Sequence, residues 1–254
     1  MATIVFTSMS SVRAHHQHGA VRWDLVKRLA PGIVLGGLLA SLDMTQALSK
    51  DDYKEQLATE QARLSGLMRD KRMRKHALIA AFEGNDAAGK GGAIRRVTGA
   101  LDPRQYRIVP IAAPTEEERA QPYLWRFWRH IPARGKFTVF DRSWYGRVLV
   151  ERIEGFASDL EWQRAYAEIN RFEQDLTEHQ TVIIKFWLAI SKDEQEQRFK
   201  AREQTAHKRF KITEEDWRNR NRWDDYLNAA ADMFAHTSTE DAPWHIIATN
   251  DKNS

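Results

Sequence analysis

The 254-residue sequence predicts an α/β fold with three layers, α/β/α, around a parallel sheet of about five strands. Five short runs of apolar residues, typical of buried strands, alternate with longer segments whose apolar residues recur at helical spacing. The hydrophobic content of 42% suffices for the core of one such domain. A glycine-rich turn between the first strand and the next helix is the third indication, because parallel α/β sheets often bind ligands at such turns.

The regular part of the chain begins with a long amphipathic helix over residues 49–75, which Ser49 caps and a basic run ends. The next segment, 76–84 (HALIAAFEG), has the length and composition of a buried strand. Residues 89–101 (GKGGAIRRVTGAL) then form a helix that starts at the glycine-rich turn. This part of the sequence therefore predicts strand, loop and helix in succession.

The alternation of strands and helices continues to the end of the chain. Further strands are expected over residues 106–114, 135–144, 181–190 and 244–251. Helices are expected over 115–131 with Thr115 as cap, over about 160–178, after the cap Ser191, and over 210–234 with Thr213 as cap. Since a covering helix would normally follow a last buried strand, we expect that a C-terminal helix is missing.

Composition and charge limit the classes of function. The sequence has 39 Lys and Arg against 35 Asp and Glu, a net charge of +4 and a pI near 9.3, which favours polyanionic partners. It has no cysteine, so disulfides and cysteine-based zinc sites are excluded, and we expect a cytoplasmic protein. The apolar stretch 29–42 is too short and too interrupted to span a membrane, and the first residues do not have the order of a signal peptide. Residues 1–47 are interpreted as a leader and inter-domain-like segment.

The glycine-rich turn has the pattern of a phosphate-binding loop. Its glycines allow backbone N–H groups to turn toward an anion, the helix presents its positive end, and Lys90 adds a mobile cation. The alternative is a plain structural turn. The residues expected to bind phosphate are Gly84, Asn85, Ala87, Ala88, Gly89, Lys90, Gly91 and Gly92. Gly91 stands where the usual pattern has a Ser or Thr that helps to hold magnesium.

Two aspartates are candidates for the missing metal ligand. Asp141 follows a hydrophobic strand, at the edge of the sheet where ligands collect, and Asp86 lies within the turn itself. Either carboxylate could hold Mg²⁺ beside the phosphates. The alternative for Asp141 is that it only caps the next turn.

Basic residues near these motifs are candidates for phosphate contacts. Arg142 and Arg147 follow Asp141, and arginine matches phosphate oxygens with two parallel donors. Surface ion pairs are the alternative for both. The basic segment 198–212, which includes Lys208 and Arg209, lies between two helices and is interpreted as part of a lid over about 198–225. A solvated charged loop is the alternative.

The segments FEGNDAAGKGG, PIAAPTEEERAQPYLWRFWRHIP, VFDRSWYGRVLVERIEGF and KRFKITEEDWRNRNRWDDY resemble the type-2 polyphosphate kinase family. The resemblance implies a P-loop kinase domain over residues 48–254 that includes the helical lid at about 198–225. It also implies phosphoryl transfer from inorganic polyphosphate to a nucleoside mono- or diphosphate with Mg²⁺. The loop of that family also ends in Gly-Lys-Gly, so Gly91 is expected. By motif, the residues implied in metal binding, phosphate binding and transfer are Asp86, Lys90, Asp141, Arg142 and Arg202.

Within the family, the second and fourth segments look more like the subgroup that phosphorylates AMP to ADP. Members of that subgroup are usually two fused copies of the domain, and this chain resembles the second copy. A nucleoside-diphosphate kinase that makes ATP or GTP remains the alternative enzyme, and an inactive polyanion-binding fragment is the non-enzyme alternative. We expect a homo-oligomer, and neither nucleic acid nor a membrane as partner.

Overall fold

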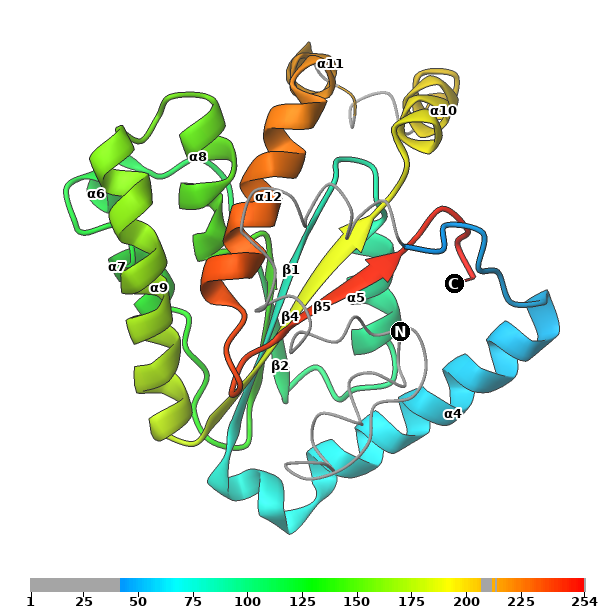
Figure 1. Cartoon of the computed structure of the whole chain (residues 1–254). Coiled ribbons are helices and arrows are strands. Elements are labelled where there is room, and N and C mark those ends of the chain that lie inside the picture. The colour runs from blue at the N-terminus through cyan, green and yellow to red at the C-terminus, as the bar shows by residue number, and fades with distance from the viewer. Residues whose placement is uncertain (1–41, 207–211, 213, 254) are drawn as a thin grey trace.

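The computed structural model describes residues 42–206, 212 and 214–253. They form a five-stranded parallel sheet in the order β2-β3-β1-β4-β5 (Figure 1). The strands are β1 (Ala77–Gly84), β2 (Tyr106–Pro110), β3 (Phe137–Asp141), β4 (Thr181–Ala189) and β5 (Trp244–Ala248). The predicted α/β fold with a parallel sheet is confirmed.

Helices cover both faces of this sheet (Figure 1). Side chains of α4 (Lys50–Arg69), the 3₁₀ helix η1 (Lys71–Lys75), α5 (Lys90–Thr98) and α10 (Lys192–Glu203) pack on one face. Side chains of η2 (Trp144–Val148), α8 (Val150–Ile153), α9 (Asp159–Glu178) and α12 (Trp223–Thr237) pack on the other. The molecule therefore has the three layers that the alternating sequence predicts.

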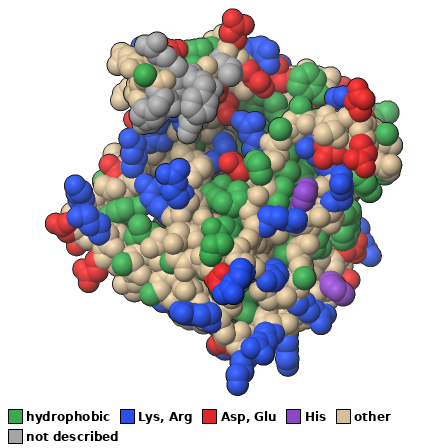
Figure 2. All heavy atoms as spheres, turned by 180° about the vertical axis from the view of Figure 1, so that it is seen from behind, with side chains coloured by type: hydrophobic (Ala, Val, Ile, Leu, Met, Phe, Trp, Pro, Cys, Tyr) green, Lys and Arg blue, Asp and Glu red, His purple; other side chains and the backbone are tan. Residues whose placement is uncertain are grey.

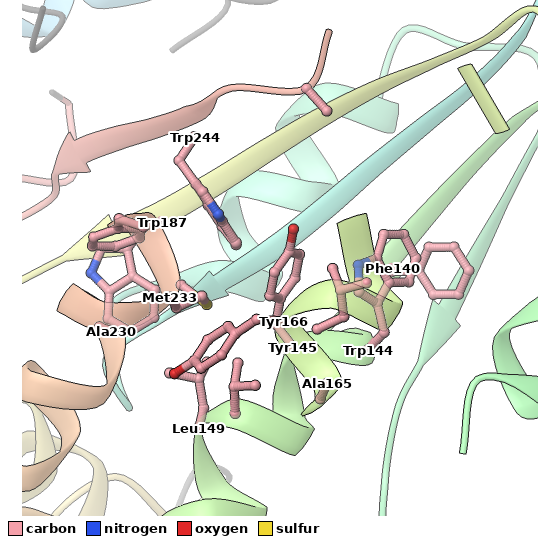
Figure 3. Packing of buried hydrophobic residues seen from close by; sticks show 14 of the residues in the cluster. Phe140, Trp144, Tyr145, Leu149, Ala165, Tyr166, Trp187, Ala230, Met233 and Trp244 are labelled. Carbon is pink, nitrogen blue, oxygen red and sulfur yellow. The ribbon is translucent and has the colours of Figure 1, made fainter. Parts of the chain in front are cut away.

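Alternation along β1 explains how one sheet supports two layers. Leu78, Ala80 and Phe82 contribute to the core under α4 and α5, whereas Ile79 contributes to the core under α9 and α12. This follows because successive side chains of a strand point to opposite faces. The second core is rich in aromatic rings, and Figure 3 shows Trp144 and Tyr145 among those that fill it.

The prediction of one continuous helix over residues 115–131 is wrong. Thr115 does cap a helix, with a complete capping box to Glu118, but that helix, α6 (Glu116–Arg119), is only one turn long. Pro122 follows, and a second short helix, α7 (Trp125–Trp128), begins after it. Proline lacks the N–H that a continuous helix would need, so the chain turns there.

The helix expected over residues 210–234 is also divided. Its described part consists of α11 (Glu214–Asn221) and α12, and the expected cap Thr213 lies outside the described residues. Arg222 between the two helices leaves helical geometry, with φ −101° and ψ 27°. Its guanidinium instead donates to the carbonyl of Ile153. This tertiary contact lies at the break between the two helices, where the sequence alone shows continuous helical periodicity.

The single helix expected over residues 49–75 is wrong at its end, because Asp70 is extended (φ −62°, ψ 139°) and divides α4 from the 3₁₀ helix η1. The other helix starts agree with the sequence. Ser49 and Ser191 cap α4 and α10, accepting from the N–H groups of Asp52 at 3.1 Å and Glu194 at 3.2 Å. Among the described residues, no helix combines the length and apolar character needed to cross a membrane. Most of the expected leader, together with Lys208 and Arg209, lies outside the residues that the structure describes.

Candidate active site

The phosphate-type loop connects β1 to α5 at the carboxyl edge of the sheet, and its backbone leaves ordinary geometry at three places. Gly84, Ala87 and Gly89 have φ of 141°, 64° and 97°. Only glycine fits at residue 84, because a Cβ there would lie 2.2 Å from the carbonyl oxygen of Leu188. The loop ends where α5 begins, so the positive end of that helix lies at the loop.

Lys90, the first residue of α5, bends back over its own loop. Its Nζ donates to the carbonyl oxygens of Gly84 at 2.8 Å and Asn85 at 3.2 Å. Burial lowers the pKa of its ammonium group, and the carboxylates of Asp86, Glu83 and Asp141 partly offset that effect. The ammonium therefore lies among all three carboxylates, at the centre of the candidate site.

Gly91 follows Lys90 in open surroundings. A Cβ added to Gly91 would meet no atom of the described residues within 4 Å. A serine or threonine hydroxyl would therefore fit, and crowding does not explain why the usual metal-binding hydroxyl is lacking.

The strand neighbouring β1 supplies Asp141 and Arg142. Asp141 pairs with Phe82 in the parallel register, so the end of β3 lies next to the start of the loop. Arg142 has φ 64°, a costly conformation for a residue with a side chain, and its N–H donates to Phe82 O at 3.0 Å. Backbone strain held in this way is frequent at functional sites.

The guanidinium of Arg142 faces the loop. Its Nη2 lies 3.4 Å from Oδ1 of Asp86. Burial lowers the pKa of Arg142, but the negative charges of Asp86, Glu83 and Asp141 outweigh burial, and the net effect is a raised pKa. Arg142 therefore stays a cation among carboxylates, suited to a phosphate oxygen that comes between them.

The carboxylates fit a magnesium ion. Within the described ranges, no three His, Asp or Glu residues are grouped so that they could hold a metal by themselves. Mg²⁺ usually needs only one or two protein carboxylates, because waters and substrate phosphates supply the other oxygens. Asp86 lies within the loop and Asp141 ends the neighbouring strand, and both carboxylates raise the pKa of Lys90, so these two could hold the ion.

Glu83 is a site residue that the sequence reasoning missed. It is the last residue before Gly84, it is only 5% exposed, and Ser143 Oγ donates to its carboxylate at 2.8 Å. Burial raises its pKa to about 7, although Ser143, Lys90 and Arg142 oppose that shift. A glutamate at the end of an otherwise apolar strand was the signal that could have identified it.

Helices α11 and α12 approach Asp86. Asn219 on α11 donates from Nδ2 to Oδ2 of Asp86 at 3.1 Å, and Tyr226 on α12 donates to Oδ1 of Asn219 at 3.3 Å. Arg202 on α10 is close enough for Asp86 to raise its pKa, although burial is the larger effect and lowers it. The structure thus brings Asp86, Lys90, Asp141, Arg142 and Arg202 to one edge of the sheet.

Arg147 instead packs against two glutamates and a tyrosine. It lies 3.0 Å from Glu151 and 3.7 Å from Glu161, and its guanidinium stacks over the ring of Tyr123 at 4.5 Å. This geometry favours the ion-pair alternative for Arg147 over the predicted phosphate contact. Basic side chains are plentiful elsewhere, and Figure 2 shows Lys and Arg spread over the rear face of the molecule.

The sequence profile of the family described as Polyphosphate kinase 2 (PPK2) matches residues 47–254. The chain belongs to the PPK2 family. The match covers the whole sheet, the loop and helices α10, α11 and α12, so each candidate residue described above lies within the PPK2 domain.

Similar proteins carry names from the same family. The chain is 71% identical to a polyphosphate:AMP phosphotransferase of Pseudomonas aeruginosa over 85% of this chain and 44% of the relative. It is 55% identical to the protein of that name from Acinetobacter johnsonii over 99% of this chain and 50% of the relative. The crystal structure of polyphosphate kinase 2 from Arthrobacter aurescens TC1 has a TM-score of 0.81 and 38% identity, covering 94% of this chain and 87% of that one. The chain spans about half the length of these two curated relatives.

Proposed function

We propose that this PPK2 domain transfers a phosphoryl group from inorganic polyphosphate to AMP, giving ADP. The observation that carries the proposal is the meeting of the loop and Lys90 with Asp141 and Arg142 at one sheet edge. That arrangement offers backbone donors, two cations and two carboxylates to a phosphate chain. AMP is the proposed acceptor because it is named for relatives that are 71% and 55% identical.

The proposed reaction asks the protein chiefly for positioning and charge neutralisation. The bond between the terminal phosphoryl group and the next bridging oxygen of polyphosphate breaks, and its electron pair stays on the shortened polyphosphate. A new bond forms to a phosphate oxygen of AMP. The loop N–H groups and Lys90 hold the donor, while Arg142 and Arg202 neutralise charge on the group that moves.

Two features of this chain's own residues bear on the reaction. Lys90 must exchange its bonds to Gly84 and Asn85 for bonds to phosphate oxygens, a movement that needs only its flexible side chain. Asp86 and Asp141 are the residues that would hold Mg²⁺, which when bound neutralises phosphate charge.

The direct test is to incubate the protein with long-chain polyphosphate and Mg²⁺ together with AMP, ADP or GDP in separate reactions. We expect ADP from AMP, detected by chromatography, at a higher rate than ATP or GTP from the diphosphates. Faster transfer to ADP or GDP would instead identify a nucleoside-diphosphate kinase. Magnesium-independent binding of polyphosphate with no transfer to any acceptor would contradict an enzymatic role.

Substitutions connect the activity to the site. Arg142→Ala should lower kcat on the order of a thousandfold, as loss of a charge-neutralising arginine does in other phosphoryl-transfer enzymes. Asp86→Asn and Asp141→Asn should each lower kcat about a hundredfold, because a bound cation stabilises the transition state by several kcal/mol. Both substitutions should also raise the Mg²⁺ concentration that gives half-maximal activity. Asp175→Asn, in the last turns of α9 and paired with Arg171, is the control that should leave transfer unchanged. Normal turnover in both active-site aspartate variants would contradict the assigned roles.

A further inference from the structure

Three successive backbone carbonyl groups of the phosphate loop accept hydrogen bonds from side chains that lie outside the loop. The acceptors are the backbone oxygens of residues 86, 87 and 88. Their donors are Gln195 Nε2 to Asp86 O at 3.1 Å, Arg198 Nη1 to Ala87 O at 3.0 Å and Thr249 Oγ1 to Ala88 O at 3.0 Å. We call Gln195, Arg198 and Thr249 the carbonyl clasp.

The geometry of the peptide unit gives the clasp a consequence for anion binding. In a trans peptide, the C=O of one residue and the N–H of the next point in opposite directions. Carbonyls 86 to 88 held outward therefore turn the N–H groups of Ala87, Ala88 and Gly89 the other way. Ala88 uses its N–H to close a turn on Asn85 O at 3.1 Å. The N–H groups of Ala87 and Gly89 lie opposite the bonded carbonyls of Asp86 and Ala88, an orientation that suits an anion on that side.

The loop needs such support because its backbone is strained. Ala87 has a Cβ and yet adopts φ 64°. This left-handed conformation costs on the order of 1 kcal/mol or more unless the surroundings hold it. The bond from Arg198 falls on the carbonyl of this same residue. The guanidinium therefore acts at the most strained non-glycine residue of the loop.

Arg198 is itself fixed by two other parts of the chain. Its Nη2 donates to the carbonyls of Thr249 at 2.6 Å and Asn250 at 2.8 Å, just after β5, and its Nε pairs with Glu194 at 2.6 Å. The side chain is only 13% exposed, so these charge-assisted bonds are shielded from water. A single guanidinium thus joins the loop, the lid helix α10 and the turn after the last strand.

The turn after β5 is fixed to α10 independently. The N–H of Ser191 donates to Asn250 Oδ1 at 2.9 Å, and Asn250 Nδ2 donates back to Ser191 Oγ at 3.2 Å. The backbone N–H of Thr249 donates to Ala189 O at 2.8 Å, so Ala189 O already has a donor and the single hydroxyl proton of Thr249 can serve Ala88 O in the loop. Residues 249 and 250 are therefore held firmly enough to serve as a support for the loop.

We propose that the carbonyl clasp positions the phosphate loop for polyphosphate. Arg198, Gln195 and Thr249 act as positioning residues that keep three loop carbonyls away from the donor phosphate, so that the N–H groups and Lys90 meet it. Arg198 acts through the loop, in contrast to Arg142 and Arg202, whose guanidinium groups are assigned to the phosphates themselves. The inference rests on the proposed function only in naming polyphosphate as the anion.

Two measurements on the full chain test the clasp. Calorimetric titration with inorganic tripolyphosphate, without AMP, measures anion affinity at the loop. Hydrogen exchange of the ligand-free protein measures how firmly the loop is held, in the peptide that contains the bonded amides of Asn85 and Ala88. The exchange measurement needs neither substrate nor activity, so it remains informative if the proposed function is wrong.

The variants separate positioning from general stability. Arg198→Met should weaken tripolyphosphate binding by about tenfold or more, since it removes charge-assisted hydrogen bonds, and should speed exchange of the loop peptide. Arg198→Lys should also bind tripolyphosphate weakly, because lysine lacks the branched guanidinium that reaches the carbonyls of Ala87 and Thr249 together. Arg152→Met is the matched control. It removes another partly buried arginine, paired with Asp232 at 2.9 Å on the opposite face, and should leave affinity and loop exchange unchanged.

A second pair of variants covers the case in which Arg198→Met fails to fold. Thr249→Val removes only the hydroxyl donor and should weaken binding several-fold, whereas Thr249→Ser keeps the donor and should restore it. Wild-type affinity and wild-type loop exchange in Arg198→Met or Thr249→Val would overturn the clasp, even if their melting temperatures fell. If the wild type itself does not bind tripolyphosphate, the proposed function is wrong, and unchanged loop exchange in the variants would then overturn the clasp as well.

Discussion

At the scale of single residues, Glu83 has the most unusual environment in the site. It is buried at the end of β1, accepts a bond from Ser143 and lies near the charges of Lys90 and Arg142. Burial still dominates and raises its pKa to about 7 from an ordinary value of 4.5. The folded protein therefore holds the Glu83 proton more tightly than the unfolded chain does.

This difference predicts how stability depends on pH. The contribution of Glu83 to folding is fully present below pH 4.5, falls as pH rises, and is lost once pH passes about 7. In Glu83→Gln the side chain cannot ionise. We therefore expect urea unfolding to show that wild type loses on the order of 3 kcal/mol relative to this variant between pH 4.5 and pH 8.

A second substitution checks the cause. The bond from Ser143 lowers the pKa of Glu83, so Ser143→Ala should move the pH-dependent loss to higher pH. An equal stability difference between wild type and Glu83→Gln at both ends of the range would contradict the raised pKa.

The positions of site residues were predictable from sequence where a motif fixes them, and not where they depend on distant contacts. The loop and Asp141 could be predicted because a strand followed by a glycine-rich turn determines where such residues lie. The clasp could not, since Arg198 meets Ala87 and Asn250 only after α10 and β5 have packed beside the loop. Arg147 shows the reverse case, because a basic residue close to the motif in sequence is turned away by Glu151 and Glu161.

At the scale of elements, strands and helix starts were predicted well, but helix continuity was not. Strand patterns and caps are local, so the sequence contains them. The division between α11 and α12 lies at Arg222, whose guanidinium contacts Ile153 in a distant part of the chain, and no local pattern marks it. Pro122 marks the division between α6 and α7 in the sequence itself, although helical periodicity on both sides of it favours one continuous helix.

The contact between α11 and the loop leads to a prediction about the lid. Asn219 donates to Asp86 with an amide, so Asn219→Asp would replace that donor with a second negative charge. The lost bond and the repulsion should together destabilise docking of α11 by about 1–2 kcal/mol at pH 8. Hydrogen exchange of residues 214–221 should accelerate roughly tenfold.

The matched control for this experiment is Asn221→Asp, which makes the same change at an exposed residue of the same helix. It should alter exchange little. Equal acceleration in both variants would mean that helix propensity, and not the Asp86 contact, holds α11 in place.

At the scale of the whole molecule, a buried polar network joins four elements beneath the site. Lys185 on β4 is fully buried, and its Nζ donates to Glu173 at 2.7 Å, Tyr145 Oη at 2.9 Å and Thr237 O at 2.7 Å. Glu173 on α9 also accepts from Trp144 Nε1 at 3.0 Å and from Tyr145 Oη at 2.6 Å. Since η2 follows Arg142 by one residue, the network fixes the chain that carries the strained part of the site.

A buried ion pair of this kind is costly to break, because the partner left behind keeps an uncompensated charge. Lys185→Met should therefore destabilise the fold by about 3–5 kcal/mol, measured by urea unfolding. Glu173→Gln should also destabilise it, although Gln can still accept from Trp144 and Tyr145. The double variant buries no charge, so its loss should be smaller than the sum of the two single losses by at least about 2 kcal/mol. Additive losses would show instead that the two charges do not stabilise each other, and the network would then act only through its neutral hydrogen bonds.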